Sequence, residues 1–377
     1  MRRTVYTAEH EAFRGDVRAF FEDEVRPEYL SWETAGKPPR WFWTRCAELG
    51  ILGISVPEEY GGTPGTTFKH SAVVTEEAQR LGLTLGGLRV QTDICMPYFL
   101  EYATAEQRER WLPRLTSGEA VSALAMSEPA AGSDMKAMAT RATLSGGGDT
   151  YVVDGGKTFI TNGLSADLVV LAVKTDPDAG RRGISLVVVE ADADGFERGR
   201  KLEKLGLRTQ DLAELFFTDM AVPVADRLGD ENRGFEYLTN NLAQERLSIA
   251  VNAQAAAVAA LDATVAAIRE SGEPADQVTK FALAGCHTDV AAGQAYVDRA
   301  LDAHDAGELD VTDAAAVKLY CTELQGTVAD RCLQVLGPGA YNRVDPVGRA
   351  FADARVSRIY GGSTEIMKVI VAKAMGL

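Results

Sequence analysis

Leu168-Val169-Val170-Leu171-Ala172-Val173 and the later Gly183-Ile184-Ser185-Leu186-Val187-Val188-Val189 are the segments that determine the class of fold. Both are short apolar runs rich in β-branched residues and bounded by Asp, Gly or Pro, which is typical of buried strands. Tyr151-Val152-Val153 predicts an earlier strand that ends in a turn at 154–157, where an Asp and two Gly residues follow. With Leu215-Phe216-Phe217 as a late strand, the sequence predicts a β-domain over residues 119–228.

Helical patterns lie on both sides of this β-domain. Before it, apolar residues recur at helical spacing in residues 11–25, and residues 105–112 predict a helix that ends at Pro113. After it, Ala-rich stretches predict helices over 236–270, 275–304, 311–335 and 345–357, and a last helix from near Ser363. We therefore expect an α+β protein with three parts. These are an N-terminal helical domain (1–118), a central β-barrel-like domain (119–228) and a C-terminal helical bundle (229–377).

The 377-residue chain is acidic, with a formal net charge of −15 and an isoelectric point near 4.9. A negative surface repels nucleic acid and anionic membranes, so we expect neither as a partner. The first residues contain no apolar signal core, and no run of about 18 apolar residues occurs, which predicts no membrane insertion. We expect a cytoplasmic protein.

The cysteines and histidines give no sign of a metal site. The five Cys residues lack any CxxC spacing, and we interpret them as buried free thiols in a reducing compartment. The four His residues are scattered along the chain, so their spacing does not match that of metal ligands.

Four short motifs carry the candidate chemistry. Gly132 allows close approach of the backbone to a ligand, and Ser127 and Ser133 beside it supply hydroxyl groups for hydrogen bonds. In order along the chain, the motifs are Met126-Ser127-Glu128-Pro129-Ala130-Ala131-Gly132-Ser133-Asp134, Phe159-Ile160-Thr161-Asn162-Gly163, Gln334-Val335-Leu336-Gly337-Pro338-Gly339, and Arg358-Ile359-Tyr360-Gly361-Gly362-Ser363-Thr364-Glu365-Ile366.

In this order and at this spacing, the motifs resemble the signatures of the acyl-CoA dehydrogenase family, and the resemblance extends over essentially the whole chain. It implies an FAD cofactor, an acyl-CoA substrate, an electron-transfer flavoprotein as partner, and a homotetramer or dimer. The cofactor-binding residues that it implies are Met126, Ser127, Ser133, Phe159, Thr161, Gln334, Gly337, Ser363 and Glu365. The substrate-binding residues that it implies are Ser133, Arg246 and Tyr360.

Two segments depart from the pattern of the family at places that contact the flavin of a neighbouring subunit. Pro338 and Ala340 replace glycines, and a Pro removes an N–H donor. The run 269–274 keeps Arg269 but lacks the Phe-Gly pair that usually follows such an arginine. These departures leave open a non-catalytic subunit of a mixed oligomer.

The catalytic base is the decisive difference. Most of the family has a Glu where this chain has Gly361. On the helix predicted over 236–270, Glu245 shares an apolar face with Leu242 and Ile249, which is unusual because burying a charge is costly. An ion pair with Arg246 or an exposed position is the ordinary explanation of such a Glu. Some enzymes of the family, which resemble isovaleryl-CoA and long-chain acyl-CoA dehydrogenases, have a Gly or Ala at the position of Gly361. These enzymes carry a Glu-Arg pair on this helix.

The resemblance therefore implies a specific reaction. Glu245 removes the α-proton of an acyl-CoA as general base, the Gly361 N–H stabilises the thioester oxygen, and the β-hydride passes to flavin. The product is a trans-2-enoyl-CoA. An acyl dehydrogenase acting on acyl carrier protein thioesters and a flavin oxidase of the same fold remain as alternatives.

Overall fold

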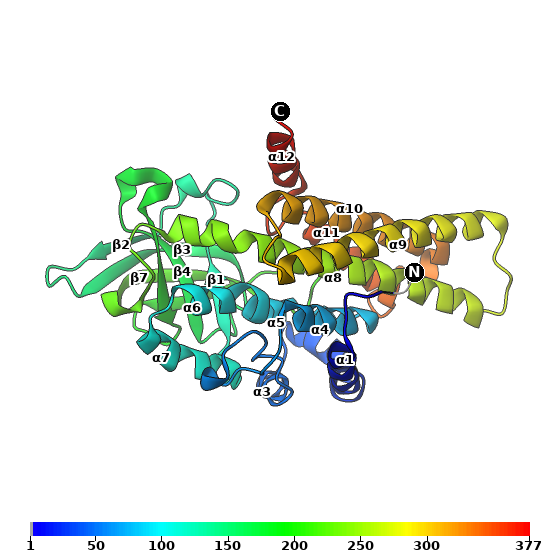
Figure 1. The fold of residues 1–377 in the computed structure, drawn as a ribbon, viewed down its shortest axis with the longest axis horizontal. Coiled ribbons are helices and arrows are strands. Elements are labelled where there is room, and N and C mark those ends of the chain that lie inside the picture. Colours follow the sequence, from blue (N-terminus) through cyan, green and yellow to red (C-terminus); the bar gives the residue numbers. More distant parts are fainter. Residues whose placement is uncertain (1–2) are drawn as a thin grey trace.

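A β-rich domain and an elongated set of helices lie end to end in the computed structural model, which describes residues 3–377 (Figure 1). The expected α+β fold class, with helices before and after a central sheet, is confirmed. The helices that precede the sheet are α1 (Ala8–Phe20), η1 (Phe21–Val25), α2 (Tyr29–Ala35), α3 (Arg40–Glu48), η2 (Glu58–Tyr60), α4 (Phe68–Arg80), α5 (Gly86–Arg89), η3 (Val90–Cys95), α6 (Met96–Tyr102) and α7 (Ala105–Thr116).

The central strands form one mostly antiparallel sheet in the order β6-β7-β3-β2-β4-β5-β8, with β1 parallel to β4. Their bounds are β1 (Ser122–Ala125), β2 (Arg141–Leu144), β3 (Thr150–Thr161), β4 (Leu168–Lys174), β5 (Ile184–Glu190), β6 (Phe196–Lys201), β7 (Leu212–Pro223) and β8 (Arg227–Leu228).

Strand β4 is buried along its whole length because both faces of the sheet are covered. Leu168 and Val170 pack with Phe99 and Trp111 from the N-terminal helices, whereas Val169 joins the core on the opposite face of the sheet. Burial on two faces explains why this strand has a continuous apolar run in place of an alternating one.

Two local predictions are wrong. The segment 154–157 is not a turn, because β3 continues to Thr161. After a register shift between Val153 and Gly155, residues 155–157 pair with β7. Helix α7 does not end at Pro113 but continues to Thr116. The Thr116 hydroxyl donates to the Leu112 carbonyl and so satisfies part of the last turn.

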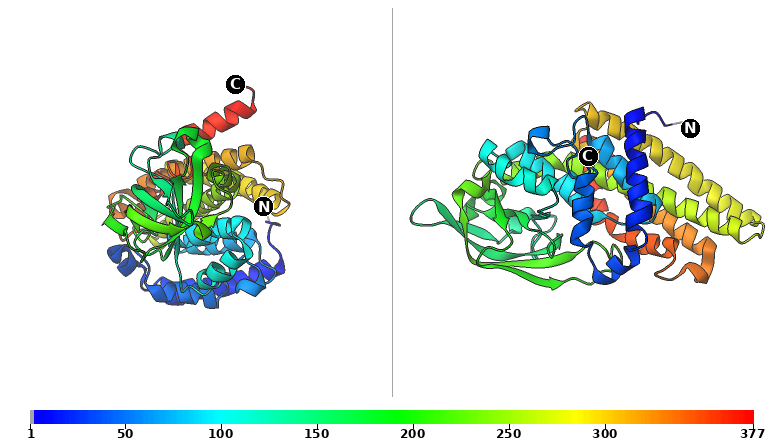
Figure 2. Two further views of the ribbon diagram at one scale, coloured as in Figure 1. Left: turned by 90° about the vertical axis from the view of Figure 1, so that its left-hand side faces the viewer. Right: turned by 90° about the horizontal axis from the view of Figure 1, so that it is seen from below.

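In the described residues, five α-helices follow the sheet: α8 (Gly234–Glu270), α9 (Gln277–Asp305), α10 (Val311–Leu336), α11 (Pro346–Ser357) and α12 (Thr364–Ala374). The first four begin and end within a few residues of their predicted bounds, and the last begins next to Ser363 as predicted. Helix α8 starts at the β-domain and runs through the bundle, where α4, α9, α10 and α11 pack on it. Helix α12 projects away from the other helices (Figures 1 and 2).

Helix α8 is also long and apolar enough to cross a membrane by length and composition alone. In the bundle, 67% of its most apolar 18-residue window is buried, as in the core helix of a helical domain. We therefore interpret its hydropathy as a consequence of its central position.

Candidate active site

Glu245 lies on α8 with its carboxylate enclosed by protein. It is 5% exposed, and Tyr98 of α6 donates a hydrogen bond from its hydroxyl to Glu245 Oε1 at 3.0 Å. Burial raises the pKa of Glu245 to about 7, against the opposing effects of the Tyr98 hydrogen bond and the nearby Arg246 charge. A buried carboxylate whose pKa lies near neutrality has the properties of a general base.

The ordinary explanations of Glu245 do not hold in the structure. It is not exposed, and the Nε and Nη1 atoms of Arg246 are buried without a hydrogen-bond partner. One turn before Glu245, the side-chain Nδ2 of buried Asn241 is also without an acceptor. Buried polar groups are normally hydrogen-bonded, so these free donors beside a carboxylate indicate a binding site for a group that brings acceptors.

Gly361 lies against α8, close to Glu245. A Cβ atom on Gly361 would be 2.2 Å from the Cδ1 atom of Ile249, which is one helical turn after Glu245. Gly361 and Gly362 both have positive φ angles, 63° and 96°, which favour glycine. Within residues 3–377, the N–H group of Gly361 has no protein acceptor, so it is free to bind a ligand oxygen.

The loop that contains Met126 and Ser127 follows β1 and is held against β3. The Thr158 N–H donates to the Ser127 carbonyl at 2.9 Å, and the fully buried Lys157 ammonium contacts Glu128 Oε1 at 2.7 Å. The carboxylate of Glu128 in turn accepts hydrogen bonds from the backbone N–H groups of residues 139 and 140. This buried ion pair fixes the loop. Ser133, further along the loop, is exposed.

Phe159 has the environment expected of a platform for a planar ligand. Its side chain is 65% exposed although both neighbours, Thr158 and Ile160, are buried, and its φ angle of 58° is unusual for a bulky residue. A register shift between Lys157 and Ile160 turns it outward, and such bulges re-aim side chains near active sites. Thr161 is two residues away, and its hydroxyl oxygen accepts a hydrogen bond from Gln210 at 2.9 Å.

The last motif begins helix α12. Ser363 is its N-cap and accepts a hydrogen bond from the Ile366 N–H at 3.4 Å, and Glu365 is exposed in the first turn. Tyr360 lines a cavity of about 310 Å³ between α4, α8 and α11. On α8 this cavity begins at Asn252, two helical turns after Glu245, so it does not include Glu245.

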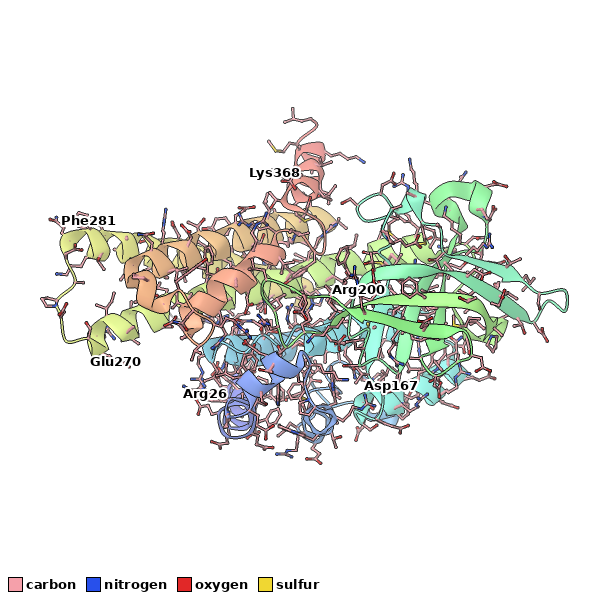
Figure 3. The ribbon with its side chains drawn as sticks, turned by 180° about the vertical axis from the view of Figure 1, so that it is seen from behind. Arg26, Asp167, Arg200, Glu270, Phe281 and Lys368 are labelled. Carbon is pink, nitrogen blue, oxygen red and sulfur yellow. The ribbon has the colours of Figure 1, made fainter. Side chains whose placement is uncertain are left out.

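Gln334 and Gly337 lie far from Glu245 in the single chain. Lys318 of α10 contacts the carbonyl of Gly362, and Gln334 is 16 residues further along the same helix. At 1.5 Å per residue, this separation is about 24 Å. The segment 269–274 is at the outer turn between α8 and α9, next to the labelled Glu270 in Figure 3. One chain alone therefore does not bring these residues to the base.

Three family models match the chain in sequence: the acyl-CoA dehydrogenase N-terminal domain over residues 7–119, the middle domain over 123–220 and the C-terminal domain over 232–376. The chain belongs to the acyl-CoA dehydrogenase family. Members are FAD-dependent flavoproteins and oxidoreductases that act on CH–CH bonds, and the expected enzyme class and cofactor are confirmed at this level.

Individual relatives extend over nearly the whole chain. It is 40% identical to the mitochondrial long-chain specific acyl-CoA dehydrogenase of Rattus norvegicus, over 98% of this chain and 87% of the relative. It is 34% identical to the mitochondrial isovaleryl-CoA dehydrogenase of Pongo abelii, over 97% of this chain and 88% of that relative. A solved acyl-CoA dehydrogenase from Geobacillus kaustophilus superimposes with a TM-score of 0.96 at 42% identity, and each chain is covered completely.

The residues present fit an FAD cofactor. Phe159 offers an exposed aromatic face to a planar ring, and the N-terminus of α12, capped by Ser363, suits an anionic group. Across residues 3–377, no group of three or more His, Cys, Asp or Glu side chains is arranged to hold a metal ion.

Three residues that contact the candidate site were missed in the sequence: Tyr98, Lys318, and Glu323, whose carboxylate accepts hydrogen bonds from Arg358 and Thr364. Tyr98 and Glu245 are 147 residues apart, and Lys318 and Gly362 are 44 apart. No short motif links such positions. The one sequence signal for Lys318 is a charged residue on an otherwise buried helical face, which is the same signal that identified Glu245.

Proposed function

We propose that this protein dehydrogenates an acyl-CoA thioester to a trans-2-enoyl-CoA, with Glu245 as the base that removes the α-proton. The observation that carries the proposal is the buried Glu245 carboxylate, hydrogen-bonded to Tyr98 and next to Ile249, on which Gly361 packs. Glu245 and Gly361 therefore meet on one face of α8, which is the arrangement that a base relocated to this helix requires.

The chain's own residues account for the proton transfer. Glu245 accepts the α-proton, and its raised pKa makes it a stronger base than an exposed carboxylate. Tyr98 holds the carboxylate in place without neutralising it. The free N–H of Gly361 donates to the thioester oxygen, where negative charge develops. FAD supplies, when bound, the acceptor for the hydride that leaves the β-carbon.

The proposal also assigns the contacts with FAD and substrate. Met126, Ser127, Phe159 and Thr161 would contact the flavin ring, and Ser363 and Glu365 lie where the N-terminus of α12 favours an anionic group. Gln334 and Gly337 would reach the cofactor of a second copy. The residues assigned to the acyl-CoA substrate are Ser133, Arg246 and Tyr360.

The partners follow from the same proposal. A homotetramer or dimer would bring Gln334 to a neighbouring active site, and an electron-transfer flavoprotein would reoxidise the enzyme. We place the enzyme in the cytoplasm, which agrees with five buried, unpaired cysteines.

The test is anaerobic bleaching of the flavin by a panel of thioesters. We expect the purified protein to be yellow and to bleach with at least one acyl-CoA, and long straight chains come first in the panel because of the long-chain relative. A colourless protein that cannot be reconstituted with FAD would contradict the proposal and favour a non-catalytic subunit.

The same assay separates the two enzymatic alternatives. Reoxidation by air at the turnover rate would identify an oxidase. Bleaching by an acyl group on acyl carrier protein, but not by the matching acyl-CoA, would identify a carrier-protein enzyme.

A further inference from the structure

Helix α10 holds both ends of the loop formed by Arg358–Thr364, here called the glycine loop. The Thr364 hydroxyl donates to Glu323 Oε1 at 2.6 Å, and Arg358 Nη1 donates to Glu323 Oε2 at 3.1 Å. The Thr364 N–H also donates to the Arg358 carbonyl at 3.0 Å. One carboxylate therefore ties the two ends of the loop together.

Lys318, also on α10, holds the middle of the glycine loop. Its ammonium donates a hydrogen bond to the Gly362 carbonyl, and the residue is completely buried. Burial and the neighbouring Arg246 charge lower the pKa of Lys318 to about 8. Burying an ammonium group is costly, so an apolar residue at this position would make the fold more stable. A buried Lys here therefore indicates a role for its hydrogen bond to the loop.

The loop needs such external support because its centre has no side chains. Gly361 and Gly362 can adopt many backbone conformations, and their positive φ angles are not enforced by any Cβ. On the α8 side, Ile249 lies within contact distance of Gly361. Lys318 fixes the loop from the α10 side, so the direction of the Gly361 N–H depends on both helices.

We propose that Lys318 and Glu323 are positioning residues that aim the Gly361 N–H at the thioester oxygen of the substrate. Glu323 fixes the ends of the glycine loop and Lys318 fixes its centre. The inference rests on the proposed function and names the residues that hold its oxyanion donor, the Gly361 N–H, in place. A donor that stabilises an oxyanion must be held within a few tenths of an ångström, so a loose loop lowers the rate without removing the base.

The experiment uses a ligand that reports oxyanion stabilisation without redox chemistry. Acetoacetyl-CoA has an acidic α-proton and no hydrogen on its β-carbon, so it forms an enolate on the protein but donates no hydride. The proton passes to Glu245 or solvent, and the negative charge moves onto the oxygen that Gly361 is proposed to contact. Titration of the enolate absorbance against pH gives the enolisation constant of the bound ligand.

The variants are Lys318→Met and Glu323→Ala, which remove charges of opposite sign. Matched controls are Lys368→Met on α12, labelled in Figure 3, and Asp330→Ala on α10, because both native residues are exposed. If the two native residues act by position, both variants lower the enolisation constant. If they act only through their charges, Glu323→Ala raises it while Lys318→Met lowers it.

We expect each positioning variant to lower the enolisation constant and the bleaching rate by about tenfold or more, less than the loss of an oxyanion donor itself. The KM for acyl-CoA, the flavin content and both controls should stay within about threefold of wild type, as expected for an effect on the transition state. Opposite changes in the two variants, or unchanged enolisation in both, would overturn the proposal.

A folding defect does not remove the test. If Lys318→Met does not retain flavin, Lys318→Gln keeps an N–H donor, and Glu323→Gln keeps an acceptor for Thr364. Because these variants keep the hydrogen bonds, the inference predicts enolisation within about threefold of wild type in both. A loss of about tenfold, or opposite changes in the two variants, would contradict it. Failure of the proposed function is distinct, because wild-type protein would then bleach with no thioester.

Discussion

The inner and outer parts of the C-terminal helices differ in how completely the chain covers them. Around Glu245, α8 is enclosed by α4, α6 and α10, and its side chains are buried almost without interruption from Glu245 to Ala257. At the outer turn, Val278 is 77% and Phe281 is 67% exposed, and Val369 on α12 is 62% exposed (Figure 3). The residues proposed for proton transfer therefore all come from one chain, whereas the exposed apolar outer surfaces are where the proposed oligomer would place a second molecule.

The strongest test of the inner part is Glu245→Gln. Glutamine keeps an oxygen that can accept the Tyr98 hydrogen bond, but its side chain cannot take up a proton near neutral pH. We expect kcat to fall by about 10³-fold or more, while flavin content stays at the wild-type level. Bleaching kinetics and absorbance at the flavin band measure both quantities. Turnover near the wild-type rate would show that another group is the base.

A second substitution tests whether a Glu at position 361, where most of the family has its base, can replace Glu245. Gly361→Glu in the Glu245→Gln background should restore less than about a tenth of wild-type kcat, because any Cβ at this positive φ collides with Ile249 and weakens the oxyanion contact. Steady-state turnover of the double variant measures this. Complete recovery would mean that the inner part accepts either base position.

The pH dependence follows from the pKa of Glu245. Because the ionised form is the base, kcat/KM should rise with pH and level off above about 7. Tyr98→Phe removes a hydrogen bond that favours the ionised form, so the acid limb should move to higher pH. A pH–rate profile of flavin bleaching checks both, and an unchanged limb in Tyr98→Phe would argue against the contact.

The same pKa predicts the pH dependence of stability. The folded protein keeps the Glu245 proton to higher pH than the unfolded chain, so the free energy of unfolding decreases as pH rises from about 4.5 to about 7. Above this range the ionised carboxylate costs about 3 kcal/mol. Glu245→Gln should therefore melt at a higher temperature than wild type at pH 8, and the difference should shrink toward pH 5. A difference that does not change with pH would contradict the assigned pKa.

The smallest effect on chemistry is expected at the outer turn. Phe281→Asp places a charge on the exposed apolar surface and should reduce the assembly size measured by light scattering, whereas Lys280→Asp beside it is the polar control. The bleaching rate per bound flavin should change by less than about threefold, because the base is enclosed within one chain. A loss of bleaching in flavin-loaded variant protein would show that the two parts are coupled.

Most of the fold could be predicted because its signals are local. The apolar run at Leu168–Val173 and the Ala-rich stretch that became α8 each contain the pattern of their own element. The predictions that failed depend on distant partners. Asp154 to Lys157 has the composition of a turn, yet pairing with β7 keeps it extended, and the hydroxyl of Thr116 supports a helical turn after Pro113.

The candidate site also has parts with local sequence signals and parts that depend on distant residues. The sequence by itself determined the family, the glycine at position 361 and a carboxylate on an apolar helical face, because residue type and spacing along one helix are properties of the chain. Only the tertiary structure decided that Tyr98 meets Glu245 and that Lys318 and Glu323 hold the glycine loop. These contacts depend on the crossing of α6, α8 and α10, since hydrogen bonds between elements form only where packing brings the two side chains within about 3 Å.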